Sequence, residues 1–171
     1  MKKLSLILFS ILIILILPPL AASNEKTISG KAKVIDGDTI RISEKKIRLF
    51  GIDAPEKEQI CKKVYLSFLI FDFQKNYKCG EKSALALLNK LKGKKVKCII
   101  KENKDRYKRN IGICYVKNQD INKWLVNNGY AIAYKKYSKK YVLNEQYAKK
   151  NKLGIWRGTF VEPEKWRRIM N

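Results

Sequence analysis

The stretch TISGKAKVIDGDTIRISEKKIRLFGI, residues 27–52, reads as three strands joined by two tight turns. Apolar residues recur along it with the period of two that is typical of half-buried strands. The turns are expected at Asp36-Gly37 and Ser43-Glu44, because Gly, Asp and Ser favour tight turns. The apolar positions of these strands are Ile28, Val34, Ile40, Ile42, Ile47, Leu49 and Ile52.

The rest of the chain is predicted to contain both helices and strands, with no internal repeat and no linker to a second domain. The expected elements are a helix over 84–91, strands over 96–100 and 111–116, a short helix capped by Asp120 and a last helix over about 140–152. In the last helix, Leu143 and Tyr147 are expected to face inward. Strands that mostly come first and helices that follow indicate an α+β fold, a small antiparallel barrel with helices at one side.

The composition excludes several kinds of chemistry. The chain has 171 residues, 38 Lys+Arg against 15 Asp+Glu, a net charge of +23 and no histidine. Without histidine there is no Ser-His-Asp or Cys-His pair and no His-built zinc site. The charge indicates a polyanionic partner: nucleic acid, an anionic membrane surface or an acidic polysaccharide. Only seven of the cations are Arg, so Lys-rich codon drift is an alternative source of part of the charge.

The N-terminus reads as a secretory signal peptide over residues 1–22. Two lysines precede an apolar run over 4–17, which ends in Pro18-Pro19 and small residues. The run is shorter than the roughly 20 apolar residues of a membrane span. We therefore expect cleavage after Ala22 and export to the periplasm or the medium, with an uncleaved anchor over 4–22 as the alternative.

Export favours disulfides for the four cysteines, all of which follow residue 22. Three connectivities are possible, and we favour Cys61–Cys79 and Cys98–Cys114. The second pair is spaced symmetrically about a central residue, as in two strands joined by a turn. Free buried thiols are the alternative.

The segment VYLSFLIFDF, residues 64–73, is aromatic, apolar and almost uncharged. We favour its burial as a strand or helix. The alternative is an exposed contact patch.

Acidic residues follow two neighbouring predicted strands. Asp36 and Asp38 flank Gly37 in the first turn. An alternative explanation for an Asp there is an Asx turn, in which its side chain hydrogen-bonds to the backbone. Asp53 and Glu56 lie past the end of the third strand. If Asp38 and Asp53 converge, two carboxylates, a backbone carbonyl and waters would form a hard-cation site of the Ca²⁺ kind, and Glu56 would remain free to act as a base.

Arginine is scarce, yet it stands near these acids or in one predicted turn, at Arg48, Arg106 and Arg109. A guanidinium fork matches the paired oxygens of a phosphate better than an ammonium does. These arginines are therefore candidate phosphate ligands, with solvated surface charge as the alternative.

The chain resembles the thermonuclease family, the staphylococcal-nuclease-like domains, over residues 27–160, which leaves 161–171 as a C-terminal tail. The matching motifs are VIDGDT (34–39), IRLFGIDAPE (47–56), DRYKR (105–109), INKWLVNNGYA (121–131) and KKNKLGIW (149–156). The resemblance implies a five-stranded OB-like barrel with about three helices. It also implies a monomeric endonuclease with Ca²⁺-dependent hydrolysis of DNA and RNA, single-stranded or frayed in preference, that leaves 3′-phosphate ends.

The resemblance also implies a role for each matching residue. Asp38, Asp53 and the Ala54 carbonyl would bind Ca²⁺. Asp36 would lie near the metal without binding it directly. Glu56 would be the general base. The remaining roles are phosphate binding by Arg48 and Arg109 and substrate contacts by Arg106, Tyr107, Lys108 and Tyr134. Lys108 stands where Gly is common in the family, so the conformation of its loop does not follow from the resemblance.

Two further hypotheses compete with a nuclease. One is a nucleic-acid-binding module on the same fold without catalysis, although the acids and arginines needed for catalysis are all present. The other is a cationic protein that binds membrane or polysaccharide and needs no acidic motif. The basic stretch around Tyr134, Tyr137 and Tyr141 could stack the bases of a single strand, with a solvated loop as its alternative.

Overall fold

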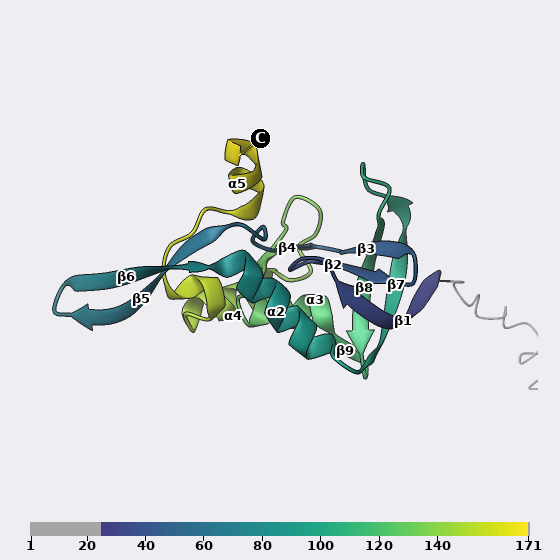
Figure 1. Ribbon diagram of the computed structural model, residues 1–171, viewed down its shortest axis with the longest axis horizontal. Helices are drawn as coiled ribbons and strands as arrows, with labels where there is room; N and C mark the ends of the chain where they lie inside the picture. Colours follow the sequence, from purple (N-terminus) through teal and green to yellow (C-terminus); the bar gives the residue numbers. More distant parts are fainter. Residues whose placement is uncertain (1–24, 171) are drawn as a thin grey trace, which may run out of the picture.

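The computed structural model describes residues 25–170, and at its centre is a closed five-stranded barrel (Figure 1). The strands are β1 (Thr27–Val34), β2 (Thr39–Ile42), β3 (Lys45–Leu49), β7 (Lys95–Lys104) and β8 (Asn110–Val116). They follow the order β3-β2-β1-β7-β8, and a β3–β8 pairing closes the barrel. This confirms the predicted α+β class and OB-like barrel. The β3–β8 pairing is parallel, because an odd number of strands cannot close with every pair antiparallel.

Smaller elements surround the barrel, and the described residues contain four α-helices, one more than expected. These elements are β4 (Ile52–Asp53) paired with β10 (Ile132–Ala133), β9 (Gln119–Asp120), α2 (Cys79–Leu91), α3 (Ile121–Asn127), α4 (Val142–Lys150), the 3-10 helix η1 (Gly154–Arg157) and α5 (Pro163–Met170). Asp120 caps α3 as predicted, since its side chain accepts a hydrogen bond from the Lys123 N–H at 2.8 Å.

The main core joins the barrel to α2 and α3. Alternate residues of β2 and β3 point inward, so Ile47 and Leu49 are buried beside Leu87 and Leu91 of α2 and Leu125 of α3. Each such side chain contributes roughly 1.5–3 kcal/mol by leaving water. The helices are thereby fixed against the barrel, close to the loop that follows β4.

Helix α4 presents a different face to the protein than its apolar spacing predicts. The prediction that Leu143 and Tyr147 face inward is wrong, because these side chains are 78% and 51% exposed. The buried side carries Glu145, whose carboxylate lies 2.7 Å from Lys135 Nζ. The other buried residue of α4 is Ala148, so the buried face has no large apolar side chain that apolar periodicity could detect.

The predicted burial of residues 64–73 is also wrong. They belong to a hairpin of β5 (Ile60–Phe68) and β6 (Phe71–Lys78), which projects from the body of the molecule (Figure 1). The two strands form a sheet of their own. Within the described part of the chain, no helix or second sheet lies against their outer segment, so its apolar side chains are exposed.

Both disulfides have the pairing favoured from the sequence. Cys98 and Cys114 are directly opposite in the β7–β8 ladder and lie in the main core. Cys61 and Cys79 join the root of the hairpin to the start of α2, within a second buried cluster that includes Ile155.

The signal peptide or anchor predicted over 1–22 lies outside the described residues. Among residues 25–170, no helix has both the length and the apolar character that crossing a membrane requires.

Candidate active site

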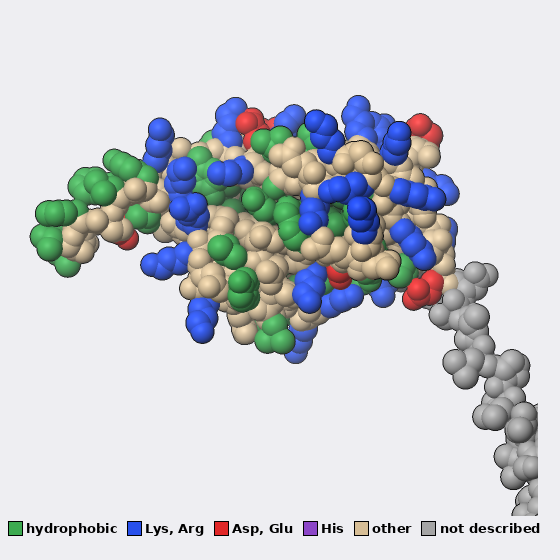
Figure 2. Space-filling view, turned by 90° about the horizontal axis from the view of Figure 1, so that it is seen from below, with side chains coloured by type: hydrophobic (Ala, Val, Ile, Leu, Met, Phe, Trp, Pro, Cys, Tyr) green, Lys and Arg blue, Asp and Glu red, His purple; other side chains and the backbone are tan. Residues whose placement is uncertain are grey.

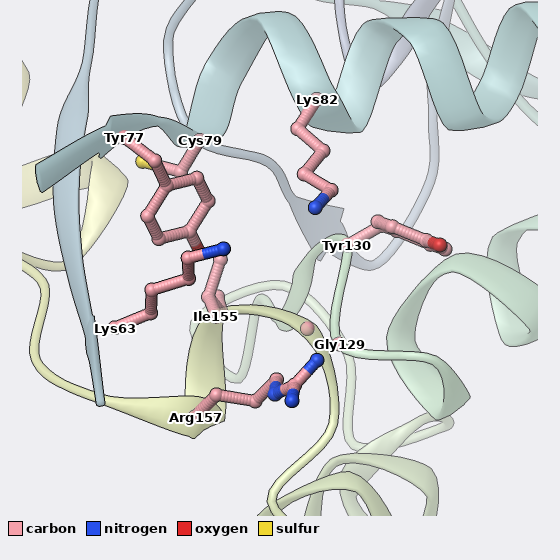
Figure 3. Close-up of a pocket in the computed structure, with 9 residues that line it drawn as sticks. Lys63, Tyr77, Cys79, Lys82, Gly129, Tyr130, Ile155 and Arg157 are labelled. Carbon is pink, nitrogen blue, oxygen red and sulfur yellow. The ribbon is translucent and has the colours of Figure 1, made fainter. Parts of the chain in front are cut away.

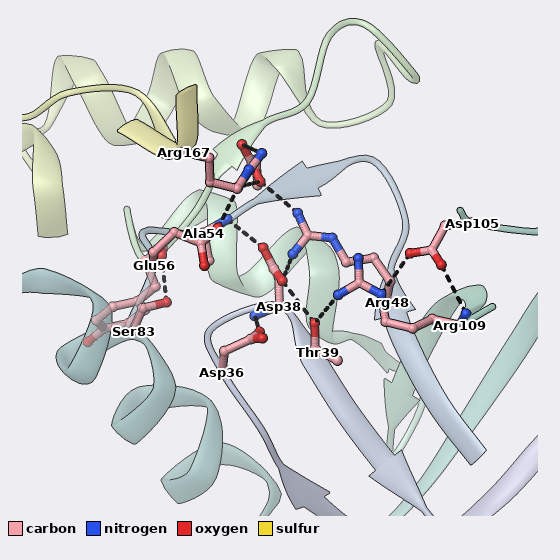
Figure 4. A network of polar contacts seen from close by, with 12 residues as sticks. Asp36, Asp38, Thr39, Arg48, Ala54, Glu56, Ser83, Asp105, Arg109 and Arg167 are labelled. Atoms are coloured by element: carbon pink, nitrogen blue, oxygen red, sulfur yellow. Dashed lines mark hydrogen bonds and ion pairs between the residues drawn. The ribbon is translucent and has the colours of Figure 1, made fainter. Parts of the chain in front are cut away.

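Two fully buried carboxylates, Asp38 and Asp53, share one arginine (Figure 4). Asp38 directly precedes β2, and Asp53 ends β4. The β2–β3 register places Arg48 opposite Thr39, and therefore beside Asp38. The Arg48 guanidinium forms ion pairs with Asp38 and with Asp53, the latter at 2.6 Å between Nη2 and Oδ1. The convergence of these two carboxylates agrees with the expectation from the sequence.

The charge of Arg48 balances the buried carboxylates. Burial lowers the pKa of Arg48, while the charges of Asp53 and Asp36 raise it. Arginine side chains stay protonated in proteins, so the guanidinium remains a cation beside these acids. A buried carboxylate without such a partner would be strongly unfavourable.

Hydrogen bonds fix the direction of Asp38. Its Oδ2 accepts from the Ala54 N–H at 2.7 Å, and its Oδ1 accepts from the Thr39 hydroxyl at 3.2 Å. Asp36 accepts from the Asp38 N–H at 3.0 Å and so faces the backbone of the turn. Burial raises the pKa of Asp36, against the opposing influence of Arg48.

The turn that carries these acids is pressed against α2. A Cβ on Gly37 would lie 2.4 Å from Ser83 Oγ and 2.7 Å from Ala54 Cβ, so only glycine fits there. Ser83 is held in turn by a 2.7 Å hydrogen bond from its hydroxyl to the Tyr130 carbonyl. Helix α2 thus fixes the distance between the Gly37 turn and the chain after β4.

Glu56 lies in a compact turn after β4. Gln59 closes this turn, since its N–H donates to the Glu56 carbonyl at 2.8 Å and its side-chain oxygen accepts from the Glu56 N–H at 3.2 Å. A Cβ on Gly80 would lie 1.7 Å from the Glu56 carbonyl oxygen, which shows how closely α2 approaches. The backbone is therefore fixed, while the Glu56 side chain remains partly open to water.

Arg109 reaches the site from the turn between β7 and β8. Its Nε donates to Asp105 Oδ2 at 2.7 Å, and its Nη1 donates to Thr39 Oγ1 at 3.2 Å. Asp105 also accepts from the backbone N–H groups of Tyr107 and Arg109. These hydrogen bonds lower the pKa of Asp105, although burial raises it. Asp105 therefore holds both the turn and the guanidinium of Arg109.

The rest of this turn is exposed, and the structure keeps it apart from the buried carboxylates. The Tyr107 ring lies between two guanidinium groups, with its centroid 4.8 Å from Arg106 Cζ and 5.3 Å from Arg109 Cζ. Lys108 has a φ of +60°, so it adopts the left-handed conformation that a Gly would adopt without strain.

Arg167 of α5 completes the set from the far end of the chain (Figure 4). Its Nη1 donates to Glu56 Oε1 at 2.6 Å, and its two terminal nitrogens lie 3.1 and 3.0 Å from the Asp53 carboxylate oxygens. Burial lowers the pKa of Arg167, but its hydrogen bonds to these two acids have the opposite and larger combined effect. The pKa of Arg167 is therefore above its ordinary value.

Tyr134 lies near α5, half-buried, and its hydroxyl is hydrogen-bonded to Glu164. Burial and this hydrogen bond raise the pKa of Tyr134 to about 12. Its ring packs edge-on against the exposed Tyr137 at 4.8 Å. Tyr141 is fully buried and donates to Asp120 at 3.0 Å, so the hypothesis that it stacks bases is wrong.

The carboxylate oxygens of this site are suitable ligands for a hard cation such as Ca²⁺, although the protein would supply few of the ligands. The residues described contain no group of three Asp, Glu, Cys or His side chains arranged around a common point. Asp38 and Asp53 supply two buried carboxylates, and the oxygen atoms that Ca²⁺ prefers can otherwise come from backbone and water. Both carboxylates face positive charge from Arg48 or Arg167, so a metal ion at this place would compete with these guanidinium groups.

A small pocket elsewhere lies between the hairpin root, α2 and η1 (Figure 3). Its volume is about 130 Å³, and its lining includes the cations Lys63, Lys82 and Arg157 beside Tyr77 and Tyr130. It contains no carboxylate, so it is not a candidate for the hydrolytic chemistry.

A family model described as "Staphylococcal nuclease homologue" matches residues 46–158. The chain belongs to this family. A relative named "Succinoglycan biosynthesis protein ExoI", from Rhizobium meliloti (strain 1021), is 35% identical over 145 residues, 84% of this chain and 70% of the relative. A relative named "Uncharacterized endonuclease", from Haemophilus influenzae, is 33% identical over 156 residues, 86% of this chain and 77% of the relative. Another relative with the same name, from Escherichia coli O157:H7, is 31% identical over 143 residues, 79% of this chain and 81% of the relative.

Membership of the staphylococcal nuclease homologue family confirms the resemblance inferred from the motifs, and it supports a nuclease. Two residues of the site were missed from the sequence. Asp105 could have been found from the sequence, because it lies four residues before Arg109 in the DRYKR motif. Arg167 could not, because only the packing of α5 brings it to Asp53.

Proposed function

We propose that this chain is a Ca²⁺-dependent endonuclease that hydrolyses the phosphodiester bonds of DNA and RNA. One observation carries the proposal: a continuous set of polar contacts joins two buried carboxylates, a partly exposed glutamate and two arginines around β2 and β4 (Figure 4). The proposed functional members are Asp38, Asp53, Glu56, Arg48 and Arg109. Arg167 links Glu56 to Asp53, and Thr39 links Arg109 to Asp38. It requires no histidine, in agreement with the composition.

The proposed metal ligands are Asp38, Asp53 and the backbone carbonyl of Ala54. A bound Ca²⁺ would supply Lewis-acid polarisation of a phosphate oxygen. Asp36 acts on this set indirectly, because it holds the Asp38 backbone at 3.0 Å.

Glu56 is the proposed general base. Its fixed backbone and partly exposed carboxylate allow it to accept a proton from a water molecule beside the phosphate. Such proton transfer accounts for about 10²- to 10⁴-fold of a rate enhancement.

Arg48 and Arg109 are the proposed phosphate ligands. Each guanidinium now donates to a carboxylate, so each has donors that can be redirected to phosphate oxygens as negative charge grows on them. Attack in line with the leaving 5′ oxygen then leaves a 3′-phosphate end. The exposed side chains of Arg106, Tyr107 and Lys108, with Tyr134, are proposed to contact the neighbouring nucleotides.

We further propose export to the periplasm or the medium. The two disulfides support an oxidising compartment. The proposed substrate is single-stranded or frayed nucleic acid, since the exposed rings of Tyr107, in the β7–β8 turn, and Tyr137, in the loop after β10, suit unpaired bases. The proposed active species is a monomer, because the whole set of acids and arginines comes from one chain.

The test is digestion of plasmid DNA and RNA with Ca²⁺ or with EDTA. Glu56→Gln and Arg109→Ala are compared with two controls that remove the same charges elsewhere, at exposed Glu58→Gln and Arg157→Ala. We expect losses of about 10²-fold or more for the first two variants and less than about threefold for the controls. The proposal fails if the wild type does not cut with Ca²⁺, or if Glu56→Gln and Arg109→Ala cut as well as it does. Binding without cutting would instead establish a non-catalytic module.

A further inference from the structure

The outer end of the β5–β6 hairpin is an apolar surface that contacts no other element among residues 25–170 (Figures 1 and 2). Leu69 and Ile70 at the turn are 87% and 90% exposed. The remaining large side chains of this end are each about half exposed or more. We call the whole set the hairpin tip: Tyr65, Leu66, Phe68, Leu69, Ile70, Phe71 and Phe73.

The strand register gathers this apolar area on one face. Leu66 is paired with Phe73, and Phe68 with Phe71, so these four side chains point to the same side of the hairpin. The opposite side carries the pair Ser67 and Asp72, where the Ser67 hydroxyl donates to the Asp72 carboxylate at 2.7 Å.

The turn itself is unusual for one that faces water. Leu69 has a φ of +53°, a conformation that favours Gly or Asn. A large apolar side chain in that conformation, and Ile70 after it, keep the most exposed positions of the arm apolar. Apolar side chains at such positions point to a partner that receives them.

Lysines surround the hairpin just behind the tip (Figure 2). Lys63 is paired with Lys75 and Lys62 with Asn76 in the ladder. None of these three lysines forms an ion pair with an acid in the part of the chain that the structure describes. At roughly 3.4 Å per residue, Lys63 lies about 10 Å behind Leu66 along the strand.

We propose that the hairpin tip binds the surface of an anionic phospholipid bilayer. The tip enters the boundary between head groups and acyl chains, and the lysines behind it contact anionic head groups. The distance between tip and lysines matches the roughly 5–10 Å to which interfacial segments are buried. Aromatic rings and lysines at this depth suit the two sides of that boundary.

The same geometry limits the depth of insertion. A spanning strand needs about 9–11 residues, whereas each strand of the tip has three or four. The hairpin tip is also two-stranded, and both of its edges carry backbone N–H and C=O groups that need water or head groups. The hairpin therefore rests in the interface, and the nuclease body stays outside the bilayer.

The experiment is sedimentation with vesicles of phosphatidylcholine alone or with about one third phosphatidylglycerol. The anionic lipid gives the vesicle surface the negative potential that attracts lysines. The protein begins at Ser23, so that the apolar run over 4–17 is absent. Residues 25–170 contain both buried clusters and both disulfides, and so fold without that run.

Two variants separate the tip from the lysines. Leu69→Asp/Ile70→Asp charges the tip, and its control is Leu143→Asp, at a leucine of α4 that is 78% exposed. Lys63→Glu/Lys75→Glu reverses the charge behind the tip. Its control is Lys150→Glu/Lys152→Glu, at the exposed last residue of α4 and in the exposed turn that follows it. Thermal unfolding checks that every variant remains folded.

We expect the wild type to bind the anionic vesicles at least about tenfold more tightly than the neutral ones. The tip variant should lose about tenfold or more, the Lys63/Lys75 variant should lose the preference for anionic lipid, and both controls should bind like the wild type. The proposal is overturned if the wild type does not bind anionic vesicles or if the tip variant binds as it does. It is also overturned if the tip mediates association of two copies, seen as a wild-type dimer that the tip variant abolishes without any vesicle binding.

Discussion

Arg167 of α5 and Asp53 of β4 form a bidentate ion pair across 114 residues of sequence, with nitrogen–oxygen distances of 3.1 and 3.0 Å. Arg167 also donates to Glu56, the proposed base, at 2.6 Å. The C-terminal helix therefore places a positive charge on two of the acids that the proposed chemistry needs. A divalent cation at Asp53 must compete with this guanidinium.

Arg167→Gln is expected to lower the Ca²⁺ concentration needed for half-maximal binding by about tenfold. The physical reason is that hydrogen bonds to a charged group contribute roughly 1.5–3 kcal/mol, which the metal would no longer have to displace. Isothermal titration with Ca²⁺ measures the effect without relying on turnover. Arg168→Gln is the matched control, because this arginine pairs with Glu164 on the exposed side of α5. An unchanged or weaker Ca²⁺ affinity in Arg167→Gln would contradict the prediction.

Asp105→Asn is expected to reduce kcat/KM by about 10- to 100-fold, although Asp105 itself contacts no buried carboxylate. The reason is that Asp105 orients the Arg109 guanidinium through the 2.7 Å contact at Nε. Steady-state cleavage of a short oligonucleotide provides the measurement. Asp72→Asn removes an acid of the same charge from the hairpin and should have no effect on cleavage.

Asp105 also predicts a pH dependence of stability. Its folded pKa is lowered, so its contribution is fully present above the unfolded pKa of about 4 and is lost as the pH falls through the lower folded value. The stability difference between wild type and Asp105→Asn should therefore be constant from about pH 5 to 7 and shrink below pH 4. Urea unfolding at several pH values tests this, and a difference that grows with acid would rule the linkage out.

Lys108→Gly is expected to stabilise the protein by about 0.5–1 kcal/mol. A non-glycine residue at φ +60° carries backbone strain that exceeds the entropic cost of glycine in the unfolded chain. Lys139→Gly is the control, an exposed lysine in a loop without a positive φ, and it should lose stability instead. Chemical denaturation distinguishes the two, and a loss of stability in both variants would show that the Lys108 conformation is unstrained.

The barrel could be predicted from the sequence because its information is local. The alternation in β1 to β3, the glycine turn and the Asp120 cap each depend on neighbours within a few residues. The face of α4 could not be predicted, because its buried residues are Glu145 and Ala148, and the Lys135 that pairs with Glu145 lies outside the helix. The hairpin tip was missed for a related reason: apolar strands are usually buried, and its strands have no partner sheet.

The candidate site also contains some residues that could be predicted from local sequence and others that could not. Asp38, Arg48 and Asp53 lie at the ends of consecutive strands, so their convergence follows from the pairing of those strands. The position of Arg167 depends on where the C-terminal helix packs, which no motif encodes. A short-range pattern can therefore identify the acids of this site and still miss a cation that balances them.

Removal of one disulfide tests how much the covalent links add to this barrel. Cys98→Ala/Cys114→Ala is expected to lower the free energy of unfolding by about 3 kcal/mol, because the bridge closes a loop with a sequence separation of 16 and restricts the unfolded chain. Cys61→Ser/Cys79→Ser, with a separation of 18, should cost a similar amount by the same reasoning. Urea unfolding of oxidised protein measures both losses.

A reducing agent provides the control for these variants. In reduced protein, the difference between wild type and each double variant should shrink to the contribution of the missing side-chain atoms. For the Cys98/Cys114 pair that remainder reflects two fully buried sulfurs in the main core. If the difference in stability is the same in oxidised and reduced protein, the disulfide stabilises by packing alone and the restriction of the unfolded chain contributes nothing.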